Sequence, residues 1–65
     1  MKKYQDLLFR RVRVNTMVHF KNGRKVNTQY IGLLLFNEED CIVIEEADKT
    51  RATINKKHIK RIEGM

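Results

Sequence analysis

The sequence predicts a small, mostly β domain in which a short N-terminal helix precedes a strongly bent, five-stranded antiparallel barrel. Three observations lead to this fold class. Residues 11–21 alternate between apolar and polar side chains, which is typical of a strand with one buried face. Four further short apolar runs follow, separated by polar turns. The chain has only 65 residues, so we expect a single domain over 1–65 that is too small for a two-layer sandwich.

The N-terminal helix is predicted over about residues 2–10. Tyr4, Leu7 and Leu8 are spaced so that they lie on one face of a helix. So short a helix is marginal by itself, and this apolar face must therefore pack against the rest of the fold. The barrel is then expected over about residues 11–63.

The first two strands are predicted to form a hairpin around Asn22-Gly23, the strongest turn signal in the chain. A two-residue loop would place Phe20 opposite Lys25, so that an apolar residue would face a polar one on the buried side. A loop of three or five residues pairs apolar with apolar, as in Phe20 opposite Val26. We therefore expect an odd loop length.

Gly32 is predicted to be the point at which the second strand bends. The pairs that follow from the register above are Val18 with Thr28, Thr16 with Tyr30 and Val14 with Gly32. A glycine inside a strand often marks a bend or a bulge. Residues 33–36 beyond it are all apolar, so this part of the strand can serve two surfaces. A long strand that bends in this way lets a small barrel close.

Three shorter strands complete the predicted sheet. They lie at residues 41–44, 51–54 and 59–62. The polar turns lie at residues 37–40, 45–49 and 55–58, and the last of these has room for one 3₁₀ turn. Cys41 is the only cysteine, which excludes an internal disulfide, and we expect it to be a small buried hydrophobe.

Charge is divided unevenly along the chain, although 14 Lys and Arg against 8 Asp and Glu leave a net charge of +6. Residues 1–27 carry eight basic groups and one acidic group, residues 28–48 carry six acidic groups and no basic one, and residues 49–65 carry six basic groups and one acidic group. If folding brings the basic ends together, they form a cationic face of the kind that binds nucleic acid. The alternative is a basic protein whose charges only face water.

Several classes are excluded by missing signals. No apolar run approaches the ~18 residues of a membrane span. Asp6 and Arg10 interrupt any signal-peptide core after the basic N-terminus, so we expect a cytoplasmic protein without membrane contact. Cys41, His19 and His58 lack the spacing of a metal site, and we expect no cofactor, no metal and no catalysis.

A resemblance to a known family rests on four motifs. These are Gln5-Asp6, Val18-His19-Phe20-Lys21-Asn22-Gly23, Phe36-Asn37 ahead of residues 41–44, and Lys57-His58 ahead of Ile59 and Ile62. Over about residues 5–62 the chain resembles the Sm-like RNA-binding family, in particular its Hfq-like branch. Thr28, Asn37 and Lys56 stand where the family has Gly, Asp and Tyr, so the resemblance is to a divergent member, of the kind that a phage or plasmid carries.

The resemblance implies a ring of identical subunits that binds single-stranded RNA, U-rich or A-rich, as an RNA chaperone or post-transcriptional regulator. A hexamer or heptamer forms when the fourth strand of one subunit pairs with the fifth strand of the next, which also hides both open edges. Two alternative functions stay open, namely a small protein-interaction module and a small DNA-binding regulator. SH3-like and OB-like barrels are the alternative folds.

The resemblance also implies which residues would contact RNA. Phe36 would stack on a base, Asn37 would bond to a base edge, Lys57 would neutralise phosphate, His58 would stack or bond, and Gln5 would reach in from the helix. A second candidate surface consists of Arg10, Arg11 and Arg13. Each residue also has a purely structural alternative: Phe36 in the core, Asn37 in a turn, and the others facing solvent.

Overall fold

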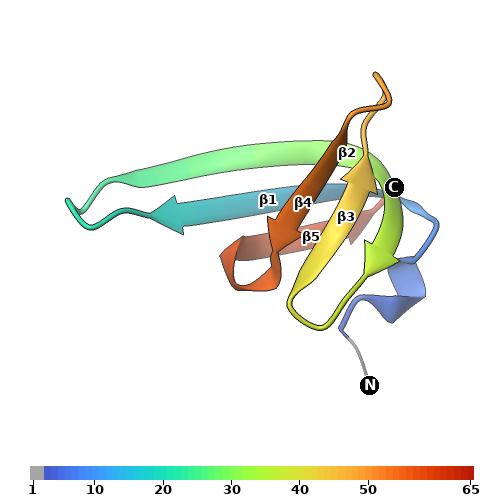
Figure 1. Cartoon of the computed structure of the whole chain (residues 1–65), viewed down its shortest axis with the longest axis horizontal. Coiled ribbons are helices and arrows are strands. Elements are labelled where there is room, and N and C mark those ends of the chain that lie inside the picture. The colour runs from blue at the N-terminus through green and yellow to red at the C-terminus, as the bar shows by residue number, and fades with distance from the viewer. Residues whose placement is uncertain (1–2) are drawn as a thin grey trace.

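The computed structural model describes residues 3–65, and its elements agree closely with the five predicted strands (Figure 1). In chain order they are η1 (Gln5–Leu7), β1 (Arg11–His19), β2 (Lys25–Asn37), β3 (Cys41–Glu45), β4 (Arg51–Asn55), η2 (Lys56–His58) and β5 (Ile59–Gly64). The 3₁₀ turn predicted within residues 55–58 is confirmed as η2. None of the helices within residues 3–65 is long and apolar enough to cross a membrane.

The five strands form one antiparallel sheet with the order β4-β3-β2-β1-β5. Figure 1 shows that β3 and β4 run obliquely to β1. They do so because β2 pairs with β1 along its first part and curves before it pairs with β3. The sheet is not closed, since β4 and β5 form its two edges and do not pair with each other within the described part of the chain. The mostly β, five-stranded antiparallel fold is thus confirmed as a single open sheet.

The predicted helix over residues 2–10 is wrong; its place is taken by a single 3₁₀ turn. Lys2 lies outside the described residues. Tyr4 and Phe9 have φ angles of 73° and 65°, left-handed values that stop a helix at both ends of η1. The segment instead joins β2, because Phe9 donates its N–H to the carbonyl of Leu34 at 2.7 Å. The predicted apolar face survives: Tyr4, Leu7 and Leu8 are half-buried and pack against the core.

The register of the first hairpin has the predicted parity but is displaced by two residues. Val18 lies opposite Val26 instead of Thr28, and Val12 instead of Val14 lies opposite Gly32. The parity is preserved because both registers keep the same side chains on the buried face. The loop is odd, as predicted. Its end is closed by the Phe20 N–H, which donates to the carbonyl of Arg24 at 2.8 Å.

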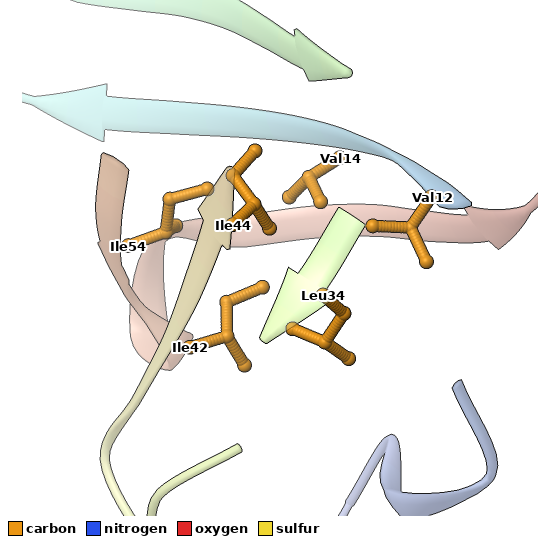
Figure 2. Packing of buried hydrophobic residues seen from close by; sticks show 6 residues of the cluster. All are labelled: Val12, Val14, Leu34, Ile42, Ile44 and Ile54. Carbon is orange, nitrogen blue, oxygen red and sulfur yellow. The ribbon is translucent and has the colours of Figure 1, made fainter. Parts of the chain in front are cut away.

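Six side chains form the core, and β2 must bend sharply to enclose them. They are Val12, Val14, Leu34, Ile42, Ile44 and Ile54 (Figure 2). Gly32, where the bend was predicted, lies where β2 passes from pairing with β1 to pairing with β3, and the backbone of β3 approaches it very closely. A Cβ atom on Gly32 would collide with the carbonyl oxygen of Glu45 and lie 2.8 Å from its carbon. Only glycine therefore allows β2 and β3 to pass at this distance.

A β-bulge at Leu35 decides which side chains near the end of β2 face the core. Leu34 pairs with Ile44 and Phe36 with Val43, so one extra residue stands in β2 between them. The bulge reverses the alternation of faces. Leu34 is fully buried, Phe36 is 47% exposed and Asn37 is only 6% exposed. Phe36 is thereby turned out of the core, and Asn37 is turned into it.

Candidate functional site

A pocket of about 400 Å³ lies where the N-terminal segment meets the end of β2. Its lining residues are Gln5, Leu8, Phe9, Leu35, Phe36, Asn37, Glu38 and Arg51. Three residues of the predicted RNA site, Gln5, Phe36 and Asn37, are therefore brought together. The pocket combines aliphatic and aromatic walls with a few polar groups, the usual make-up of a small-ligand site.

Two aromatic rings stand exposed at this pocket. Phe36 is 47% exposed because of the bulge at Leu35, and Phe9 is 69% exposed. Phe9 takes this position because its left-handed φ of 65° and its hydrogen bond to Leu34 place the end of the N-terminal segment beside β2. A flat ligand can therefore stack on an aromatic ring here without a large movement of the protein.

Gln5 and Asn37 form a polar pair in the pocket wall. Asn37 donates from Nδ2 to Oε1 of Gln5 over 2.9 Å, which ties the N-terminal segment to the end of β2. This bond uses one of the two lone pairs of Gln5 Oε1, and Nε2 is the group of Gln5 that can donate to a ligand. The Oδ1 atom of Asn37 is buried and has no hydrogen-bond partner among residues 3–65. Asn37 thus acts mainly by orienting Gln5.

Lys57 and His58 do not line the pocket, but η2 lies on the same side of the molecule as η1 and the β2–β3 turn. The backbone N–H of Lys56 donates to the carbonyl of Asp40 at 2.8 Å, which joins η2 to the β2–β3 turn. Lys56 also donates from Nζ to the Lys3 carbonyl at 3.4 Å. Figure 1 shows η1, the β2–β3 turn and η2 along the lower side of the molecule.

The start of η2 is capped in a way that fixes Lys57. The Oδ1 atom of Asn55 accepts a hydrogen bond from the Lys57 N–H at 3.0 Å, a common N-cap arrangement. The side chain of Lys57 is exposed, and His58 is half-buried. Lys57 is therefore held by its backbone while its amine stays in solvent.

The three arginines of the second candidate surface are not part of the pocket. Arg11 and Arg13 alternate with the buried Val12 and Val14, so both lie on the outer face of β1. Arg10 precedes the strand and is exposed. The Nε atom of Arg13 is buried and has no partner within the described residues.

Acidic groups lie close to the pocket, which sequence reasoning did not foresee. Glu38 lines it, and residues 38–40 form the turn that touches η2. Among the described residues of the lining, the basic one is Arg51, whose Nε lies 3.8 Å from Oε2 of Glu45. At the β3–β4 turn, hydrogen bonds from the side chain and backbone of Thr50 hold the pKa of Asp48 below its ordinary value, so this carboxylate stays charged.

Within residues 3–65, no group of three or more His, Cys, Asp or Glu side chains could hold a metal ion. Cys41 is a free, half-buried thiol at the start of β3.

Comparisons with protein-family models, with curated proteins and with solved structures found no match to this chain.

Proposed function

We propose that this protein is a divergent Sm-like protein that binds single-stranded RNA without catalysis and acts in the cytoplasm as an RNA chaperone or post-transcriptional regulator. One observation carries the proposal. The pocket joins an exposed aromatic ring, Phe36, to an amide donor, Gln5, whose orientation is fixed by Asn37. A ring face beside a fixed hydrogen-bond donor is what recognition of an unstacked base requires.

The pocket favours a base with an exposed carbonyl oxygen. Phe36 offers a face for stacking, which is sequence-tolerant because every base has a π-face. The Nε2 group of Gln5 adds a preference for an acceptor on the base, because the bond that Oε1 accepts from Asn37 orients the amide so that Nε2 can donate. Uracil carries two carbonyl acceptors, whereas the pairing edge of adenine sets one ring-nitrogen acceptor beside an amino donor. We therefore expect U-rich RNA to bind more tightly than A-rich RNA.

Phosphate contacts at the pocket come from η2. Lys57 is exposed and fixed by the Asn55 cap, so its amine is available to a phosphate next to the bound base. His58 lies in the same turn and offers a second bond or stack. The outer arginines, Arg10, Arg11 and Arg13, form a separate rim on which a longer strand can rest.

Assembly into a hexameric or heptameric ring follows from the two open edges. β4 and β5 each end the sheet, and within residues 3–65 no further strand pairs with their outer sides. Pairing β4 of one copy with β5 of the next would satisfy both edges and would complete a barrel-like wall around each core. Such a head-to-tail contact closes into a ring when its rotation permits, and the pocket is then repeated once per subunit.

The RNA-binding proposal is tested by fluorescence anisotropy with labelled U-rich and A-rich single strands over a range of salt concentrations. We expect micromolar or tighter binding to the U-rich strand, with an affinity that falls as salt rises because counterions are released. Duplex DNA of equal length serves as a competitor and should compete poorly. Absence of salt-dependent binding at micromolar protein concentrations would refute the proposal.

A protein-interaction module is the second candidate, favoured by the open edges of β4 and β5 and by Glu38 beside the pocket. An extended peptide can add to a free strand edge by main-chain pairing. In that case RNA would bind weakly and the pocket would accept an apolar or basic peptide side chain. A DNA-binding regulator has less support, because no helix within residues 3–65 exceeds three residues and none could serve as a recognition helix.

A further inference from the structure

The far end of the β1–β2 hairpin forms an arm, defined here as Met17–Asn27, that extends beyond the rest of the sheet. β5 pairs with β1 only from Val12 to Thr16. β3 pairs with β2 only from Leu33 to Asn37. Figure 1 shows the arm at the left end of the longest axis, away from η1 and the β2–β3 turn. The molecule extends 36 Å along this axis, so the arm reaches well away from the pocket.

The arm is strongly cationic. No acidic residue occurs between Asp6 and Glu38, a stretch that includes the whole arm. Lys21, Arg24 and Lys25 are all exposed at its tip. None of these three cations belongs to an ion pair in the described part of the chain, because the pairs found there are between Lys49 or Arg51 and Glu45, and between Arg61 and Glu63. Their charge is therefore available to a partner.

An aromatic ring stands among these cations. Phe20 is 51% exposed, although it continues the inward-facing series of Val18. The tip around it is held by three hydrogen bonds: Phe20 N–H to the Arg24 carbonyl at 2.8 Å, Gly23 N–H to the Phe20 carbonyl at 3.0 Å, and Arg24 N–H to Asn22 Oδ1 at 2.9 Å. The backbone that carries the ring and the cations is thus ordered before binding, which lowers the entropy cost of binding.

We propose that the arm is a second RNA-contacting element, in which Phe20 stacks on a base while Lys21, Arg24 and Lys25 contact the phosphates of a strand that extends past the pocket. This inference rests on the proposed function. Charge complementarity selects a polyanion as the occupant, and the exposed ring selects one with unpaired bases. The arm also adds phosphate contacts to the one that Lys57 offers beside the pocket, where Glu38 in the lining repels phosphate.

The test compares two RNA lengths and two matched pairs of substitutions. A U-rich strand of about 3 nucleotides reaches only the pocket and its surroundings, and one of about 20 nucleotides can also reach the arm. The arm variant is Lys21→Gln with Lys25→Gln. The control variant is Lys49→Gln with Lys60→Gln, which removes the same two charges from exposed lysines outside the arm. Urea unfolding of both variants confirms that they remain folded.

We expect the arm variant to bind the short strand as the wild-type protein does and to bind the long strand more weakly. The slope of log affinity against log salt should become shallower by about 1.4 for the long strand, because about 0.7 is lost per single-strand phosphate contact. Phe20→Ala should weaken the long strand about tenfold, and Phe20→Tyr should restore it. The control variant should change the salt slope by less than the arm variant does, for the short strand and for the long strand.

The outcomes separate this inference from the function on which it rests. Binding of neither strand by the wild-type protein would refute RNA binding altogether, the arm included. Normal binding of both strands by the wild-type protein, with arm and control variants that behave alike on the long strand, would overturn the role of the arm alone. An equal loss for the short and long strands would also overturn it, since the arm would then act only through general charge.

Discussion

Substitution of Gly32 by alanine is expected to destabilise the protein by about 3 kcal/mol or more. The added Cβ would collide with the carbonyl of Glu45, and backbone at a strand crossing can't move aside as a flexible side chain can. Relief would require β2 and β3 to separate, which would open the core around Leu34 and Ile44. A domain of this size has about 3–10 kcal/mol of stability in all, so much of the variant should be unfolded at 25 °C.

The measurement is urea unfolding followed by circular dichroism at one fixed protein concentration, because assembly would also contribute to stability. Gly64→Ala is the matched control. A Cβ there would lie 3.2 Å from Cδ2 of Leu7, a flexible side chain, so the change should cost less than about 1 kcal/mol. Equal midpoints for the two variants would show that the bend of β2 does not depend on Gly32.

Phe36→Ala is expected to lower the affinity for U-rich RNA by about a hundredfold or more. Base–aromatic stacking contributes about 1–3 kcal/mol per base, and in a ring the loss recurs in every subunit that the strand contacts. Stability should change little, because Phe36 is 47% exposed and lies outside the core. Anisotropy with the labelled U-rich strand measures the affinity, and urea unfolding measures the stability.

Leu33→Ala is the control for this substitution. Leu33 is also an exposed apolar residue of β2, 38% exposed, but it does not line the pocket. Its removal should leave RNA affinity within about twofold of the wild-type value. Phe36→Tyr retains a ring and should bind nearly as the wild type does. An affinity of Phe36→Ala equal to that of Leu33→Ala would rule out stacking at this pocket.

The strands could be predicted because each has a local signature. Residues 11–21 alternate, residues 41–44 form a short apolar run, and polar turns bound them both. The odd length of the hairpin loop could also be predicted, since it depends only on which faces of the two strands are apolar. The displacement of the register by two residues could not, because Val26 and Thr28 are both acceptable partners for Val18.

The N-terminal helix was mispredicted because the spacing of Tyr4, Leu7 and Leu8 suits a single 3₁₀ turn as well as a longer helix. What decides between them is a distant contact. The N–H of Phe9 bonds to Leu34 in β2, and the chain adopts a left-handed φ at Phe9 to do so. No local pattern in a sequence reports a partner 25 residues away, and tertiary contacts therefore override the local preference.

The candidate site was predicted in its residue types but not in its construction. The outward position of Phe36 depends on the bulge at Leu35, which a run of four apolar residues conceals. The bond between Asn37 and Gln5 joins positions 32 residues apart. Phe9 and Arg51 line the pocket only because the folded chain brings them there. For Phe9 the sequence did contain one indication, an aromatic residue at the end of an apolar segment.

Native mass spectrometry of the protein with and without a U-rich oligonucleotide tests the central claim most directly, because it reports both assembly and RNA binding. We expect a closed assembly of six or seven protomers in the absence of RNA, and the same assembly carrying bound oligonucleotide in its presence. A single protomer in both samples, with no bound RNA, would contradict both the pairing of β4 with β5 between copies and the repeated RNA site that depends on it.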